Sequence, residues 1–406
     1  MTVNESDKIC SVLQENHCAA EGICPISENC GGCLYQGVSY EEQLRIKDKA
    51  IRRLLDKHHL PQDVYEGLMP ALDVYGYRNK MEYTFGDLEK GGELTLGMHL
   101  KGRFMSIVTS DCCQLVPKDF NRVLEATLKF CREKGYTFYH RKSHEGLLRN
   151  LVVRHGVRTG ELLVNIVTSS EEGFDEQGFL EMLQSLKLDN QLVGVLRTYN
   201  DSVADVVLNE GLKILWGREY YNEEILGLKF KVNAFSFFQT NIAAIERLYA
   251  DALALIPEIG DKTVYDLYCG TGTISQLMAL KAKEVYGVEI VQDSVDAAVD
   301  NAVLNGISNC HFICGDVRKT LDQLPVKPEM IVVDPPRVGM HDKVVDMLAG
   351  YGIPEILYIS CNPKTLCMNL ERFSQYGYEP VVMRAYDNFP LTKHVETVVL
   401  MSRFEK

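Results

Sequence analysis

The chain has 406 residues, of which 46% are apolar and 24% are charged, as in an ordinary globular protein with room for two or three domains. Its 43 basic and 56 acidic residues give a formal net charge of −13, which weighs against a nonspecific nucleic-acid binder with a basic excess. The sequence shows neither a run of about 18 apolar residues nor a secretory signal pattern, so we expect a cytoplasmic protein without a membrane span.

Residues 1–38 form a cysteine- and glycine-rich region with weak periodicity. The chain has thirteen cysteines and no secretion signal, which indicates metal-binding or catalytic thiols rather than a disulfide framework. Cys24, Cys30 and Cys33 supply three thiols within ten residues, and such thiolates hold either zinc or an iron–sulfur cluster. A fourth thiol has to come from elsewhere, and Cys112 and Cys113 are adjacent candidates.

Residues 39–74 are predicted to contain a basic amphipathic helix and a linker. Apolar residues share one face of this helix at Tyr40, Leu44, Ile51, Leu54 and Leu55. The same segment carries a basic cluster of Arg45, Lys47, Lys49, Arg52, Arg53 and Lys57. This cluster is either a solvated face or a contact with RNA.

Residues 75–232 are expected to form a central, antiparallel, β-rich domain. Turn signals separate short strands predicted at Leu94–Met98, Leu151–Arg154, Leu162–Val167 and Val203–Val207. A helix is predicted near Asn121–Lys134. A second basic cluster, with the same two interpretations, contains Arg141, Lys142, Arg149, Arg154 and Arg158.

Residues 233–406 alternate helical patterns with apolar strands. The predicted strands are Thr263–Leu267, Glu284–Glu289, Cys310–Cys314, Met330–Val333, Ile356–Ser360, Val381–Ala385 and Val395–Ser402. This alternation, which ends in two closely spaced strands, predicts an α/β doubly wound sheet with an antiparallel strand at its edge.

The turn after the first of these strands is glycine-rich. Gly270 and Gly272 let the backbone approach a ligand at a helix N-terminus, and Glu289 can accept hydrogen bonds from two ribose hydroxyls. A site for NAD uses the same logic, and this turn nearly satisfies G-x-G-x-x-G. Ser275 in the third place and Asp266 at the strand end favour S-adenosylmethionine over NAD.

Two later strands end on reactive side chains. Asp334 opens an Asp-Pro-Pro-Arg motif, and Arg337 stands where methyltransferases of amino groups carry an aromatic residue, which argues against that chemistry. Cys361 follows the next strand. A thiolate that adds to C6 of a pyrimidine makes C5 nucleophilic enough for methylation. The alternative is a buried cysteine with a packing role.

Methylation at C5 also requires a base, because the C5 proton has to leave. His394 and Glu396 lie two residues apart on a predicted strand and therefore share a face. A glutamate shielded from water has a raised pKa suited to proton abstraction. The alternative is a pair of polar surface residues.

Several motifs occur together in this chain: Cys24-Pro, Cys30-Gly-Gly-Cys33, Tyr77-Arg78, Ser236-Phe-Phe-Gln239-Thr-Asn241, Asp266-Leu-Tyr268-Cys-Gly270, Asp334-Pro-Pro-Arg337, Ser360-Cys361-Asn-Pro363 and His394-Val-Glu396. In this order they resemble the bacterial iron–sulfur-containing RNA 5-methyluridine methyltransferases, in the branch that modifies 23S rRNA. The resemblance implies a class I, Rossmann-like methyltransferase domain at 233–406. It also implies a central RNA-binding domain and a small N-terminal iron–sulfur region.

The resemblance also assigns roles to single residues. Cys361 corresponds to the nucleophile that attacks C6, and Glu396 to the base that removes the C5 proton. The implied contacts of S-adenosylmethionine are Gln239, Tyr268, Glu289 and Asp334, with Asp316 ranked lower. The implied ligands of a [4Fe–4S] cluster are Cys24, Cys30, Cys33 and Cys113, with Cys113 preferred to Cys112.

The expected function is methylation of C5 of a specific uridine, which is flipped out of its stack, with 23S rRNA favoured over tRNA. We expect a monomer without an obligate protein partner. Some relatives carry an N-terminal RNA-binding β-barrel, and the 23 residues before Cys24 are too few for one. The rival hypotheses are an iron–sulfur NAD-dependent oxidoreductase and an RNA-binding assembly factor without catalysis.

Overall fold

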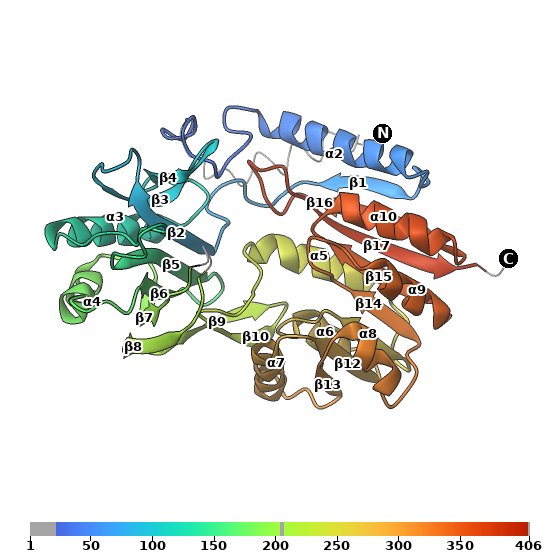
Figure 1. The fold of residues 1–406 in the computed structure, drawn as a ribbon. Coiled ribbons are helices and arrows are strands. Elements are labelled where there is room, and N and C mark those ends of the chain that lie inside the picture. Colours follow the sequence, from blue (N-terminus) through green and yellow to red (C-terminus); the bar gives the residue numbers. More distant parts are fainter. Residues whose placement is uncertain (1–21, 204–206, 405–406) are drawn as a thin grey trace.

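The computed structural model describes residues 22–203 and 207–404, in which two large β-sheets lie side by side (Figure 1). A hairpin of β9 (Tyr220–Ile225) and β10 (Leu228–Asn233) connects them. The helical segments are α2 (Tyr40–Lys57), α3 (Lys118–Glu133), α4 (Glu176–Ser185), α5 (Ile242–Ala254), α6 (Thr273–Ala279), α7 (Gln292–Leu304), α8 (Val317–Thr320), η1 (Leu321–Gln323), α9 (Asp342–Gly350) and α10 (Pro363–Ser374). Within the described ranges, no helix combines the length and apolar character needed to cross a membrane.

The central sheet has seven strands in the pairing order β4 (Arg103–Thr109), β3 (Leu94–Leu100), β2 (Lys80–Asp87), β5 (Leu148–Gly156), β6 (Glu161–Thr168), β7 (Gln191–Tyr199) and β8 (Gly211–Gly217). Its neighbours are antiparallel except β6 and β7, which are parallel and joined through α4. Three of the predicted strands and the helix near Asn121–Lys134 are confirmed. The strand predicted at Val203–Val207 falls on residues 204–206, outside the described residues.

The second sheet has eight strands in the order β1 (Tyr65–Met69), β16 (Tyr378–Tyr386), β17 (Glu396–Arg403), β15 (Glu355–Ser360), β14 (Met330–Val333), β11 (Thr263–Leu267), β12 (Glu284–Glu289) and β13 (Cys310–Cys314). Successive residues face opposite sides, as a strand requires. Met330 and Val332 join a core with α5 and α6, whereas Ile331 and Val333 join a core with α2, α9 and α10. The sheet is therefore doubly wound, as predicted.

The predicted placement of an antiparallel strand at the sheet edge is wrong. β17 pairs antiparallel with both β15 and β16 and lies inside the sheet. The strand at that edge is β1, which runs parallel to β16. β1 lies within 39–74, where only a helix and a linker were predicted. Its sequence Tyr-Glu-Gly-Leu-Met contains one strand-favouring residue, Tyr65, and no β-branched one, so local propensity gives only a weak strand signal and pairing with β16 decides the structure.

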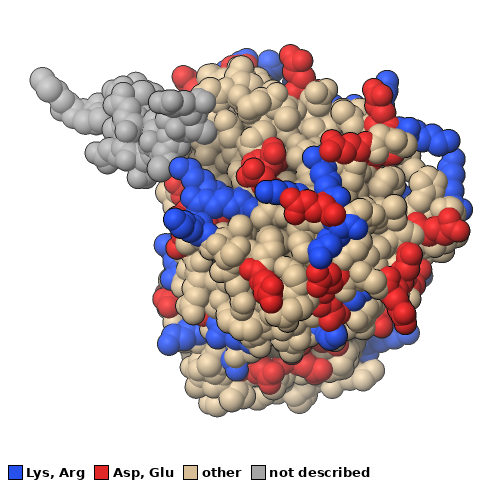
Figure 2. Space-filling view, turned by 90° about the vertical axis from the view of Figure 1, so that its left-hand side faces the viewer, with Lys and Arg blue, Asp and Glu red and all other residues tan. Residues whose placement is uncertain are grey.

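Both basic clusters contain residues that are not on the surface. The side chain of Lys47 is only 1% exposed, and Arg154 is likewise buried. Arg149, also buried, donates to the backbone oxygens of Asn200 and Ser202. On the face drawn in Figure 2, basic side chains are mixed with acidic ones. These three residues are therefore structural contacts rather than members of RNA-binding faces.

The two sheets are joined next to the segment that carries Gln239. The Nδ2 of Asn79 donates to the backbone oxygen of Gln239 at 3.1 Å, and the Asn79 backbone N–H donates to Thr240 at 3.0 Å. The guanidinium of Arg154 donates to the backbone oxygen of Ser236 at 2.7 Å. Because these donors belong to the central unit, that unit fixes the backbone around Gln239.

Candidate active site

The reactive side chains meet at one edge of the eight-stranded sheet. Asp266 lies on β11, Asp334 directly follows β14, and Cys361 directly follows β15. These parallel strands end at the same edge, where α/β enzymes bind their ligands. β17 runs in the opposite direction, and Thr397 pairs with Ser360, so β17 begins at this edge with Glu396. The sheet therefore places Glu396 beside the strand end that carries Cys361.

Three carboxyl groups surround a buried tyrosine at this edge. Burial is the main cause that raises the pKa of Asp266 and of Asp334 to about 7. Burial, and then repulsion by Asp334, raises the pKa of Glu396 well above its usual range. Burial, and then the charges of all three carboxylates, raise the pKa of Tyr249. The Tyr249 hydroxyl accepts a hydrogen bond from Gln239 Nε2 at 3.3 Å. Gln239, Asp334 and Glu396 therefore belong to one polar group.

Cys361 is half-buried and shares this environment. Burial, and then the charges of Glu396 and Asp334, raise the pKa of its thiol to about 11. Arg337 opposes this shift through its charge and a hydrogen bond to the thiol. Since only the thiolate is a good nucleophile, Arg337 is the described side chain that favours the reactive form.

The glycine-rich turn supplies a backbone cradle at the same edge. Tyr268, Gly270 and Gly272 have φ values of 66°, 54° and 75°, in the left-handed region. A Cβ on Gly272 would lie 2.6 Å from the ring of Phe312, so this position has no room for a side chain. The carboxylate of Glu289 accepts backbone hydrogen bonds from Gly270 and from the two residues that follow Glu289, at 2.8–3.2 Å.

A buried acceptor on β11 also faces this region. Ser275 Oγ donates to one oxygen of Asp266 at 2.5 Å, while the other oxygen, Oδ1, has no hydrogen-bond partner in the described part of the chain. A buried unpaired acceptor is costly unless a ligand pairs with it. The carboxylates of Asp266 and Asp334 therefore suit a ligand that carries positive charge and N–H donors.

Two candidate residues occupy positions that the sequence did not anticipate. His394 lies before β17 rather than on it, so it does not share a strand face with Glu396. Asp316 caps α8, and its carboxylate binds the guanidinium of Arg318, which lowers the pKa of Asp316 to about 2. Sequence reasoning also missed Tyr249, because its spacing on α5 is that of an ordinary core residue.

A separate cavity lies between the N-terminal loop and the central sheet. It is lined by Cys24, Cys30, Cys33 and Cys113 together with apolar residues such as Met98, whereas Cys112 is not among its lining residues. All eleven cysteines in the described ranges are free. Among those same residues, no group of three or more His, Cys, Asp or Glu side chains is arranged to hold a metal ion.

The cysteine-bearing loop is bonded to two other segments. The backbone N–H of Gly31 donates to His99 at 3.0 Å, which attaches the loop to the β3–β4 hairpin. The backbone N–H groups of Leu34 and Tyr35 donate to Leu391 at 2.9 and 3.1 Å. Leu391 lies in the segment that leads into β17 and Glu396. The thiol cavity is therefore connected through the backbone to the edge that carries the reactive side chains.

Known proteins resemble this chain along most of its length. Residues 187–404 match the family model described as tRNA (uracil-5-)-methyltransferase. Proteins described as uncharacterized RNA methyltransferases are 45% identical in Clostridium tetani, over 98% of this chain and 87% of that protein, and 35% identical in Chlorobaculum tepidum, over 97% and 85%. The crystal structure of the Pyrococcus abyssi tRNA (uracil-54, C5)-methyltransferase in complex with S-adenosyl-L-homocysteine is 27% identical, with a TM-score of 0.76, over 92% of this chain and 84% of that one.

Alkylation of Cys361 in the ligand-free protein should become faster with rising pH up to about pH 11, because the thiolate is the reactive species. Arg337→Met should slow the reaction at a fixed pH below about 11, because loss of the cation raises the thiol pKa further. Short pulses of iodoacetamide followed by peptide mass spectrometry measure the rate, and the exposed Cys314 serves as an internal reference. A rate that levels off below pH 9, or faster labelling in Arg337→Met, contradicts this electrostatic account.

Proposed function

Since this chain belongs to the family of RNA (uracil-5-)-methyltransferases and has their S-adenosylmethionine-dependent α/β fold, we propose that it methylates C5 of a specific uridine through a covalent bond between Cys361 and C6. The observation that carries this proposal is the meeting of Cys361 and Glu396 at one sheet edge, through the pairing of β15 with β17. Methylation at a pyrimidine C5 needs both a nucleophile and a base. Membership of this family also argues against the alternative hypothesis of an NAD-dependent oxidoreductase.

The proposed reaction begins with addition of the Cys361 thiolate to C6. A C6–S bond forms, and the electrons of the C5–C6 double bond move to C5, which then takes up the methyl group. Glu396 removes the C5 proton, the double bond re-forms, and the C6–S bond breaks to release the thiolate. Burial makes Glu396 a stronger base than an exposed carboxylate, while the charge of Arg337 opposes this rise in its pKa.

S-adenosylmethionine, when bound, supplies an electrophilic methyl group. We propose Gln239, Tyr268, Glu289 and Asp334 as its contacts. The cradle at Gly270 and Gly272 and the acid at the end of the next strand support a nucleoside-binding role. The buried, unpaired oxygen of Asp266 supports a ligand with positive charge, such as a sulfonium or an ammonium group.

For the RNA target we propose 23S rRNA. Support comes from the resemblance of the cysteine motif to the rRNA-modifying branch. The second candidate is tRNA, which is supported by the likeness to the Pyrococcus abyssi tRNA methyltransferase. We further propose a cytoplasmic protein that acts as a monomer. Free thiols, such as those of the eleven cysteines in the described ranges, persist in that compartment.

We also propose that Cys24, Cys30, Cys33 and Cys113 hold a [4Fe–4S] cluster. The support is that these four thiols line one cavity, and cysteine thiolates are the ligands that hold such clusters. Methyl transfer requires no electron. We therefore assign the four ligands a structural role, in which they fix the N-terminal loop to the segment between β4 and α3 that carries Cys113.

The enzyme with S-adenosylmethionine should form 5-methyluridine in a 23S rRNA transcript, detected by nucleoside mass spectrometry and mapped to its position. Cys361→Ala should reduce the product to background, because no other route makes C5 nucleophilic. Cys131→Ala, which alters a buried cysteine of α3 outside this edge, should remain active. If 5-methyluridine forms in tRNA but not in 23S rRNA, the proposed substrate is wrong and the proposed reaction stands. If it forms in neither RNA, the proposed function is wrong.

Anaerobically purified enzyme should contain about four iron and four sulfide per chain. Cys113→Ser should lose the cluster, and the adjacent Cys112→Ser should retain it, because only Cys113 lines the cavity with the other three thiols. Iron and sulfide analysis and the visible absorption spectrum measure both outcomes. Bound zinc in place of iron, or equal loss in the two variants, would contradict the assignment.

A further inference from the structure

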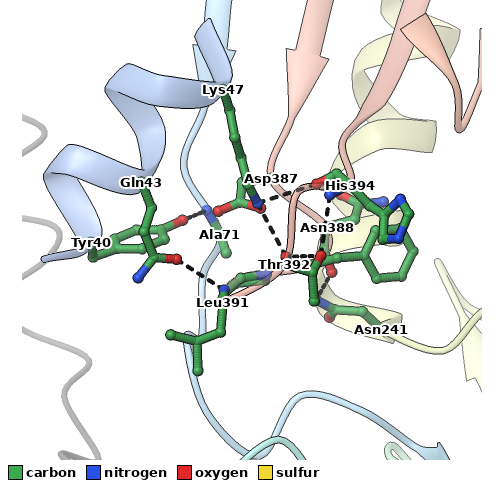
Figure 3. Close-up of polar contacts among 12 residues, drawn as sticks. Tyr40, Gln43, Lys47, Ala71, Asn241, Asp387, Asn388, Leu391, Thr392 and His394 are labelled. Carbon is green, nitrogen blue, oxygen red and sulfur yellow. Dashed lines mark hydrogen bonds and ion pairs between the residues drawn. The ribbon is translucent and has the colours of Figure 1, made fainter. Parts of the chain in front are cut away.

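A buried ion pair holds the segment that precedes the proposed base. Lys47 Nζ on α2 lies 2.6 Å from Asp387 Oδ1, and the two side chains are 1% and 0% exposed (Figure 3). Lys47 Nζ also donates to the backbone oxygens of Phe389 at 3.1 Å and of His394 at 3.2 Å. All three ammonium protons therefore have acceptors, which a buried charge requires.

The segment 387–395, here called the β16–β17 loop, is irregular and is hydrogen-bonded to distant parts of the chain. Its Leu391 has a φ of 64°, which is uncommon for a residue other than glycine. The amide of Gln43, also on α2, accepts from the Leu391 N–H at 2.9 Å. Asn241 donates to the backbone oxygen of Asn388 at 2.9 Å, and Tyr77 to that of Pro390 at 3.0 Å.

Lys47 differs from these other contacts because it bonds to both ends of the loop. Asp387 and Phe389 lie near the start of the loop, whereas His394 lies near its end, two residues before Glu396. One ammonium group thereby connects the two ends of the loop, next to the pairing of Tyr386 on β16 with Glu396 on β17. The Glu396 side chain leaves the backbone at this pairing. A shift of the loop would therefore act on Glu396 through the adjoining backbone.

The other reactive side chain is held mainly by segments outside this loop. Cys361 follows β15 and precedes Asn362, which caps α10 and donates to the backbone oxygen of Arg337 at 2.8 Å. The hydrogen bonds of Lys47 do not involve this segment. The link from β17 to this segment is the pairing of Thr397 with Ser360, which lies outside the loop. Loss of Lys47 should therefore disturb Glu396 more than Cys361.

We propose that Lys47 is a positioning residue for Glu396, which aligns that carboxylate with the C5 proton through the β16–β17 loop. The proposal rests on the proposed function. It predicts that Lys47 acts on one step alone: addition and methyl transfer proceed, and proton removal slows. The methylated adduct, still bonded to Cys361, then accumulates on ordinary RNA. A residue that merely stabilises the fold would lower the amount of active enzyme without trapping this adduct.

The test uses the full-length enzyme, S-adenosylmethionine and the transcript that the wild type methylates, either 23S rRNA or tRNA. Lys47→Met keeps the length of the side chain and removes its charge, and Asp387 can then be protonated because burial raises its pKa. We expect kcat to fall about 10- to 100-fold, the cost of a small misplacement of a catalytic group, with KM within about threefold. A denaturing gel should show a covalent enzyme–RNA band like that of Glu396→Gln.

Arg45→Met is the matched control, because it removes a positive charge from the same helix at an exposed position. It should leave kcat unchanged and give no covalent band. Unchanged kcat in Lys47→Met, or lower kcat without the band, overturns the proposal. If Lys47→Met does not fold, Lys47→Met/Asp387→Leu, which leaves no buried charge, is measured by the same criteria. A Glu396→Gln variant that traps no adduct would instead contradict the proposed function.

Discussion

The direction of one strand determines how this site is built. β17 runs against its neighbours inside the eight-stranded sheet, so it begins where the parallel strands end. Glu396 thereby lies at the edge where β15 delivers Cys361. Had β17 been parallel to β15, the two side chains would lie at opposite ends of the sheet. The β16–β17 loop makes this reversal, and residues of the N-terminal loop and of α2 are hydrogen-bonded to it.

In the ligand-free protein, the surroundings of the carboxyl groups at this edge disfavour their ionised form. A cationic ligand would favour it. Burial raises the pKa values of Asp266, Asp334, Glu396 and Cys361, and the charge of Asp334 adds to this effect at Glu396 and Cys361. Arg337 is the cation that acts on both Cys361 and Glu396. A cation bound at this edge interacts strongly with the carboxylates, because the low dielectric of the interior magnifies each interaction. We infer that binding of the sulfonium cofactor supplies positive charge that balances these carboxylates.

The sequence predicted the strands at the core of the sheet, because each apolar run ends abruptly in a polar residue. The bounds of β11 to β14 follow from that pattern alone. It could not predict the burial of Lys47 or Arg154, because the acceptors, Asp387 and the backbone of Ser236, lie far away along the chain. The family resemblance assigned the cofactor contacts and the cluster ligands, which local spacing had left open between alternatives.

The most direct test of the central claim is to identify the protein atom that bonds to uracil. RNA with 5-fluorouridine at the methylated position, incubated with S-adenosylmethionine, should trap the intermediate, because fluorine at C5 cannot leave as a proton. Digestion and mass spectrometry of the trapped species should then place the RNA fragment on Cys361. A fragment attached to any other residue, or no trapped species from enzyme that methylates ordinary RNA, would contradict the account.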